Sequence, residues 1–124
     1  DKAIKINPNN AEAFYMRGNL QFDLKNYEDA IADYSQALEI KPDDDQALLW
    51  RGIAYSKSNK HSKAINDFSK AIDLNPKDAF YYYTRGFSKL KTEEIKGACS
   101  DWEKASSMKY ENAKKWLDKY CRNI

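Results

Sequence analysis

The chain has 124 residues, 42% of them hydrophobic, which suits one domain with a core that needs neither metals nor many disulfides. Its 21 basic and 19 acidic residues leave a net charge of +2, too small to favour nucleic acid or an anionic membrane as a partner. No stretch reaches the roughly 20 apolar residues that cross a bilayer, so we expect no membrane insertion, and composition leaves the compartment open.

Glycines and prolines recur at a fixed interval. Three of the four glycines and all three prolines step by 34 residues: Gly18, Gly52 and Gly86, and Pro8, Pro42 and Pro76. This interval predicts three repeats, 11–44, 45–78 and 79–112, because the same apolar and small residues recur in each. The recurring residues are Phe14, Leu48 and Tyr82; Ala30, Ala64 and Ala98; Tyr34, Phe68 and Trp102; and Ala37, Ala71 and Ala105.

Residues 1–10 precede the first full repeat. Ala3, Ile4, Ile6 and Pro8 match the end of a repeat, from its small residue to its proline. We therefore expect 1–10 to be the tail of a preceding repeat's second helix, and the chain to be a fragment of a longer array.

Each repeat is predicted to form two helices, because its apolar residues recur three and four positions apart. Pro42 and Pro76 are expected to end the second helix, and Asn26 and Asn59 to mark the turn between the two helices. The small residue Gly18 would let the helices approach closely, with the later aromatic residue filling the wider gap beside it. One such hairpin cannot bury its own apolar face, so the repeats are expected to stack.

The last segment, 113–124, is predicted to be a capping helix, because no partner hairpin follows its apolar stripe. Lysines and an aspartate occupy the opposite face. The stripe consists of Ala113, Trp116, Leu117, Tyr120 and Cys121.

This pattern resembles the tetratricopeptide repeat family, and the resemblance covers nearly all of the chain. Helix pairs of that family carry an early large apolar residue, then Gly or Ala, and later Ala, an aromatic residue, Ala and Pro. The resemblance implies an all-α fold, a right-handed α-solenoid of three helix-turn-helix repeats plus the C-terminal capping helix. It also implies a binding scaffold and not an enzyme.

One departure from the family pattern is consistent. Arg17, Arg51 and Arg85 precede the glycine where the family usually has Leu, which is typical of an RG variant of the repeat. We predict that each arginine forms an ion pair across its hairpin, which would compensate a charge near the core. The alternative is that both residues face water. The partner aspartates are Asp33, Asp67 and Asp101.

Catalytic chemistry is not indicated. His61 is the only histidine, and the repeat alignment puts it in a turn, without further ligands at metal-binding spacing. The chain has no glycine-rich phosphate loop and no nucleophile elbow. We therefore expect no catalytic residues, no metal and no cofactor.

The family resemblance implies that the first helix of each repeat lines a concave face. The positions that match are rich in aromatic and apolar residues, which anchor ligands in peptide-binding surfaces. The alternative is that some of these rings only thicken the core. The predicted peptide-binding residues are Tyr15, Asn19, Phe22, Leu49, Trp50, Ile53, Phe80, Tyr83 and Phe87.

The family's clamp of Lys and Asn residues for a partner's C-terminal carboxylate is not expected. Of its positions only Asn19 has a fitting residue; Tyr15, Trp50, Phe80 and Thr84 occupy the others. We expect another protein or peptide as the partner, either an apolar extended segment or an amphipathic helix. The alternative is a structural spacer that self-associates through its N-terminal end. RNA binding fits less well, because no basic stripe interleaves with the aromatics.

Tyr110 lies in the turn before the predicted cap. Cys99 precedes it by eleven residues, and Cys121 follows it by eleven. Two antiparallel helices joined there would bring the cysteines to the same level. The sequence is compatible with two states of these cysteines, a disulfide or a pair of reduced, buried thiols. A disulfide would favour an oxidising compartment.

Overall fold

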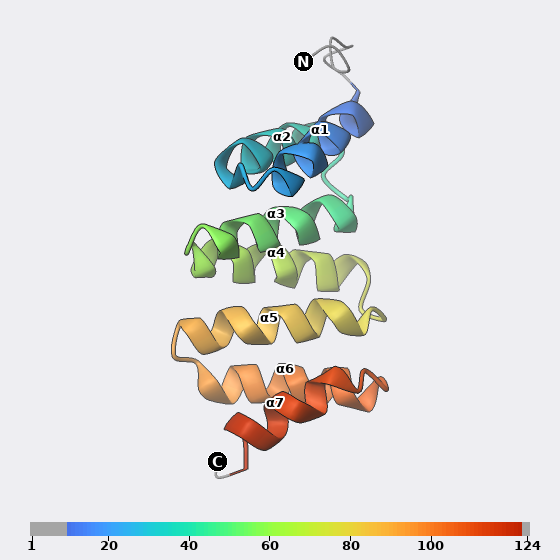
Figure 1. The fold of residues 1–124 in the computed structure, drawn as a ribbon. Helices are drawn as coiled ribbons and strands as arrows, with labels where there is room; N and C mark the ends of the chain where they lie inside the picture. The colour runs from blue at the N-terminus through green and yellow to red at the C-terminus, as the bar shows by residue number, and fades with distance from the viewer. Residues whose placement is uncertain (1–9, 123–124) are drawn as a thin grey trace.

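The computed structural model describes residues 10–122, which form seven helices stacked in one row (Figure 1). Helices α1 and α2 lie at one end of the row, and α7 lies at the other. Successive helices pack on one another, and α3 also touches α1 and α5. The fold is therefore a helical solenoid of repeats with a terminal helix. The helices are α1 (Ala11–Asp23), α2 (Tyr27–Ile40), α3 (Asp45–Lys57), α4 (His61–Leu74), α5 (Ala79–Lys91), α6 (Ile95–Ser107) and α7 (Asn112–Tyr120).

Each repeat begins at a capped helix. The side chains of Asn10, Asp44 and Asp78 accept hydrogen bonds from backbone amides in the first turns of α1, α3 and α5. Apart from Asn10, the segment expected to be the tail of a preceding repeat lies outside the described residues. Pro42 and Pro76 each stand two residues past the end of a second helix, as expected, because proline cannot continue it.

The turns inside the hairpins match expectation except at one residue. Their left-handed residues are Lys25, Asn59 and Glu93, with φ of 64°, 62° and 63°. Asn26 and Asn59 both lie between the paired helices, as expected, although only Asn59 is itself left-handed. The expectation for His61 was wrong, since this residue is the first of α4 and not part of the turn.

The aromatic residue of each second helix lies directly on a glycine of the first. A Cβ atom added at Gly52 would stand 2.6 Å from Cε1 of Phe68, and one at Gly86 would stand 2.5 Å from Nε1 of Trp102. Both aromatic side chains are fully buried. The predicted close approach is confirmed, because the ring lies where a side chain at the glycine position would stand.

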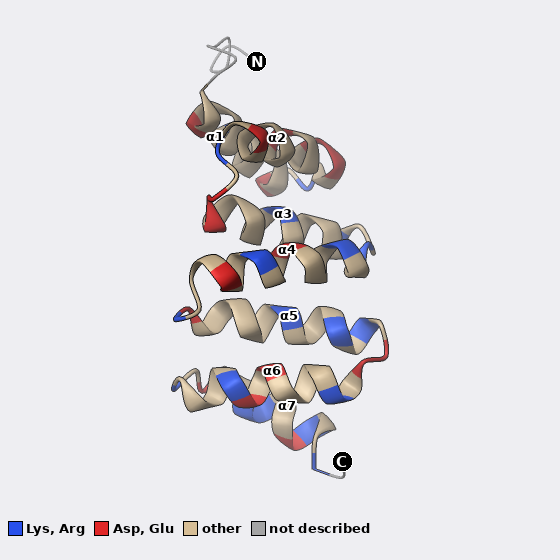
Figure 2. Ribbon diagram, turned by 180° about the vertical axis from the view of Figure 1, so that it is seen from behind, with Lys and Arg blue, Asp and Glu red and all other residues tan. Residues whose placement is uncertain are grey.

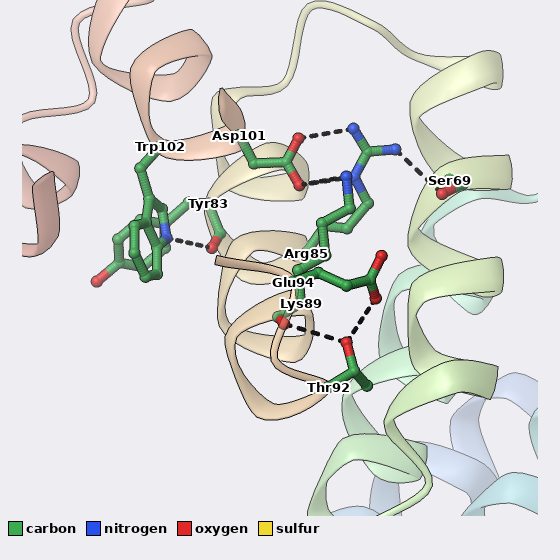
Figure 3. A network of polar contacts seen from close by, with 8 residues as sticks. All are labelled: Ser69, Tyr83, Arg85, Lys89, Thr92, Glu94, Asp101 and Trp102. Carbon is green, nitrogen blue, oxygen red and sulfur yellow. Dashed lines mark hydrogen bonds and ion pairs between the residues drawn. The ribbon is translucent and has the colours of Figure 1, made fainter. Parts of the chain in front are cut away.

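The predicted ion pairs across the hairpins are confirmed. In the third repeat, Arg85 donates from Nε and Nη2 to the two carboxylate oxygens of Asp101, at 2.8 and 2.7 Å (Figure 3). Arg85 Nη1 also donates to Ser69 Oγ of the preceding repeat at 3.0 Å. The hydrogen bond to Asp101 raises the pKa of Arg85, against an opposing effect of burial. The two-pronged pair therefore lets a charged residue replace an apolar one beside the core.

Helix α7 closes the end of the core, as predicted. Ala113 is fully buried, and the rest of the predicted stripe packs against the same cluster as Trp102. Lysines on its other face are exposed. Of the two alternatives for the cysteines, the structure contains the disulfide between Cys99 and Cys121, whose Cα atoms are 5.8 Å apart.

Candidate functional site

A groove of about 590 Å³ runs along the first helices of the three repeats. Its walls come mainly from α3 and α5. One ring comes from α1, Asn59 comes from the turn between α3 and α4, and His61 is the first residue of α4. Side chains project into it from successive turns of parallel helices, because residues three, four and seven positions apart share one helical face. The lining residues are Phe22, Trp50, Ile53, Ser56, Lys57, Asn59, His61, Phe80, Tyr83, Thr84, Phe87 and Lys91.

A smaller hollow of about 420 Å³ adjoins the groove on the α1 side. The two share Phe22 and Trp50, so these rings stand between them. Asn19, Asp23 and Tyr34 complete the lining of the hollow. A bound segment could therefore pass over Trp50 from one space into the other.

Seven of the nine predicted binding residues line these two spaces. Asn19 lies in the hollow, and the rest lie in the groove: Phe22, Trp50, Ile53, Phe80, Tyr83 and Phe87.

The other two predicted residues do not line either space. Leu49 is only 3% exposed and belongs to the core, so its placement on the binding surface was wrong. Tyr15 is half-buried against that core, with its ring 5.9 Å from the ring of Tyr34. Burial raises the pKa of the Tyr15 hydroxyl, so this group remains a neutral hydrogen-bonding partner.

The rings at the α1 side of the groove hold one another in place. Phe22 meets Trp50 edge to face, with centroids 5.5 Å apart, and meets Tyr27 in the same way at 5.3 Å. Such pairs add about 0.5–1.5 kcal/mol to the effect of burial. Trp50 is half-buried and touches the central core, so one side of its indole is fixed while another faces the groove.

The rings at the other end of the groove rest on α7 and on the turn before it. Phe87 lies 4.9 Å from Trp116 of α7, and Tyr83 lies 4.7 Å from Tyr110, measured between centroids. Trp116 also donates from its indole nitrogen to the Tyr83 hydroxyl at 3.0 Å. The cap therefore orients the side chains that α5 presents to the groove.

The groove is apolar along its floor and basic at one end. Lys57 and Lys91 are exposed at the C-terminal ends of α3 and α5, and no acidic residue is among the lining residues. Burial and the positive charge of Lys91 lower the pKa of His61, so its imidazole is mainly neutral near pH 7. None of these three is among the nine predicted binding residues, although Lys57 and Lys91 match concave positions of the family and lie 34 residues apart.

The described part of the chain contains neither a candidate metal site nor a candidate membrane span. Across residues 10–122, no group of three or more acidic, histidine or cysteine side chains could hold a metal ion. No helix in that range has the length and apolar character needed to cross a bilayer.

Stacked helical hairpins with a continuous core define a helical-repeat solenoid. The tetratricopeptide repeat model matches residues 11–44 and 46–78, just over half of the chain. The chain belongs to the tetratricopeptide repeat family.

Solved structures resemble it along most of its length. The Sgt2 repeat domain from Aspergillus fumigatus is 30% identical over 92% of this chain and 78% of its own, with a TM-score of 0.83. The first repeat domain of Spaghetti (RPAP3), bound to the HSP90 peptide SRMEEVD, is 24% identical over 94% of each chain, with a TM-score of 0.84. The OM64 repeat domain from Arabidopsis is 21% identical over 92% and 96%, with a TM-score of 0.86. The last two share the fold alone. No curated protein matches the sequence significantly.

Proposed function

We propose that the chain is a non-catalytic protein-interaction module that binds an apolar or aromatic-anchored peptide or helix in its groove. The observation that carries this proposal is the ring-lined groove itself, whose aromatic side chains are held by neighbouring rings and yet remain partly accessible. Rigid rings bury large areas at little cost in conformational entropy. A domain of the same fold was solved with a peptide bound, which supports a peptide as the ligand.

We further assign the repeats to the RG variant of the family, with limits 11–44, 45–78 and 79–112 and a cap at 113–124. Each Arg–Gly pair recurs with a bidentate aspartate partner, which supports the assignment. The first helices begin 34 residues apart, at 11, 45 and 79, which supports the limits.

The binding mode that we propose differs from a clamp for a terminal carboxylate. Among the clamp positions, only Asn19 has a suitable side chain, and its Oδ1 already accepts a hydrogen bond from the Tyr34 hydroxyl at 2.6 Å. Trp50, Phe80 and Thr84 offer no cation at the others. An apolar anchor packed over Trp50 suits these residues better.

Trp50→Ala is expected to weaken peptide binding by about 2 kcal/mol, because Trp50 stands where the groove and the hollow meet. The probe is a set of peptides selected on the wild-type protein from a random displayed library, with affinity measured by fluorescence anisotropy. Leu74→Ala is the matched control, since Leu74 is 46% exposed and lies outside the groove. Unchanged affinity in Trp50→Ala would contradict the proposal, and equal losses of affinity and melting temperature would assign Trp50 to the core.

Self-association is a second candidate function, favoured by an apolar stripe along α1 and its C-cap residue. Met16, Leu20 and Leu24 recur every four residues and are 61%, 48% and 62% exposed. At the positions of α3 and α5 that correspond to Leu20, Ala54 and Ser88 are buried. A second copy that packed α1 against α1 would cover both stripes.

Under this second candidate, the mass from light scattering should rise with protein concentration, and Leu20→Lys should keep the chain monomeric. Leu74→Lys, a similar change on α4, should leave association intact. A wild-type mass that stays monomeric at every concentration would reject self-association.

A further inference from the structure

The last residue of each repeat's first helix lines the binding surface and carries a charge. These residues are Asp23 in α1, Lys57 in α3 and Lys91 in α5, each 34 positions from the next. Asp23 lines the hollow, whereas both lysines line the groove. The binding surface is therefore acidic at its α1 end and basic at its α5 end. Figure 2 shows the basic residues at the C-terminal end of α5.

Neither groove lysine has an acidic partner within the part of the chain that the structure describes. Among the described residues, other lysines do form ion pairs: Lys60 lies 3.5 Å from Glu28, and Lys89 lies 3.3 Å from Asp101. Lys57 and Lys91 form none, and the groove lining contributes no carboxylate. Their charges are therefore available to a ligand, next to the apolar floor.

One bound segment could contact both the lysines and the apolar floor of the groove. Ile53 and Trp50 line the groove one and two helical turns before Lys57, and Phe87 lies one turn before Lys91. A segment that packs an apolar side chain on these residues would bring its next few residues to the lysines. Complementary charge at such an edge fixes the orientation of a ligand and speeds its association.

Building on the proposed function, we propose that the occupant is an internal segment of another protein in which an aromatic or large aliphatic anchor lies close to an Asp or Glu side chain. The anchor packs on Trp50 and Phe87, and the carboxylate meets Lys57 and Lys91. The carboxylate comes from a side chain and not from a chain end, because the groove continues past Trp50 into the hollow and lets the segment run on in both directions.

The test begins with random peptides displayed between flanking residues, so that no peptide presents a free terminus. Selected sequences are synthesised with acetylated and amidated ends, each with a partner peptide in which Glu or Asp becomes Gln or Asn. We expect enrichment of an acidic residue within a few positions of an aromatic or aliphatic one. The amide versions should bind about tenfold more weakly, as expected for the loss of two exposed charge contacts.

The protein is varied in parallel. Lys57→Glu combined with Lys91→Glu should weaken the acidic peptides about tenfold or more, and added salt should weaken their binding to the wild type. The matched control is Lys77→Glu with Lys114→Glu, which makes the same change in net charge at exposed sites outside the groove. It should leave affinity within about twofold. Circular dichroism melting checks that each variant is folded.

The outcomes separate this inference from the proposed function. If selected peptides bind through Trp50 but lack acidic residues, or bind the groove charge-reversal variant as well as the wild type, the inference is wrong and the proposed function stands. If the selected sequences bind only when they are synthesised with a free C-terminal carboxylate in place of the amide, the choice of an internal segment is wrong. If no peptide is selected, or if none responds to Trp50→Ala, the proposed function fails as well.

Discussion

Asp67→Ala is expected to lower the free energy of unfolding by about 3–5 kcal/mol, because it leaves the guanidinium of Arg51 without its partner. Asp67 is 1% exposed, and its two oxygens accept from Nε and Nη2 of Arg51 at 2.8 and 2.7 Å. The remaining bond from Arg51 to Ser35 Oγ, at 3.1 Å, joins neighbouring repeats but cannot neutralise the charge. Urea denaturation measures the loss.

A double-mutant cycle separates the pair from its surroundings. Arg51→Leu with Asp67→Ala should cost less than Asp67→Ala alone, since no unpaired charge remains beside the core. Additive losses would reject the coupling. The pair of Arg17 and Asp33 provides a graded control: the arginine side chain there is 29% exposed, against 18% for Arg51, so Asp33→Ala should cost less.

Removal of the Cys99–Cys121 disulfide is expected to lower the free energy of unfolding by about 2–4 kcal/mol. The bond links residues 22 positions apart, and so restricts the unfolded chain and ties α7 to α6. The comparison is the oxidised wild type against Cys99→Ala with Cys121→Ala, in urea without reductant. Reductant should destabilise the wild type to about the level of the variant and leave the variant unchanged.

Thiol titration of the unfolded, unreduced protein gives an independent check on the disulfide. No free thiol together with an intact monomer mass is the expected result. Two free thiols per chain would mean that the bond is absent in solution, and a doubled mass would mean that the cysteines join two copies.

Much of the fold could be predicted because its determinants are local or repeated. A glycine and a later aromatic residue, such as Gly52 and Phe68, recur in every repeat, so the sequence predicts that the two helices approach closely there. The pairing of Arg51 with Asp67 was predictable for the same reason, because a charge near a core needs a partner and only one recurs with it.

The errors at the site come from side-chain size and from helix ends. Leu49 occupies the repeat position of Tyr15 and Tyr83, but its shorter side chain ends within the core. Residues at corresponding repeat positions therefore differ in solvent exposure. His61 was misplaced because a helix start is uncertain by a residue or two when no side chain caps it. The state of Cys99 depends on oxidation, which no spacing in the sequence encodes.

The contact between the cap and the groove couples ligand affinity to the position of α7. Tyr83 and Phe87 each present one side to the groove, while Tyr110 and Trp116 support them from the C-terminal end. A ligand that packs on these two rings favours the docked position of α7, and a docked α7 favours the ligand by an equal amount of free energy. Affinity at this end of the groove is therefore thermodynamically linked to the docking of the terminal helix, through two rings that line the groove and also contact the C-terminal end.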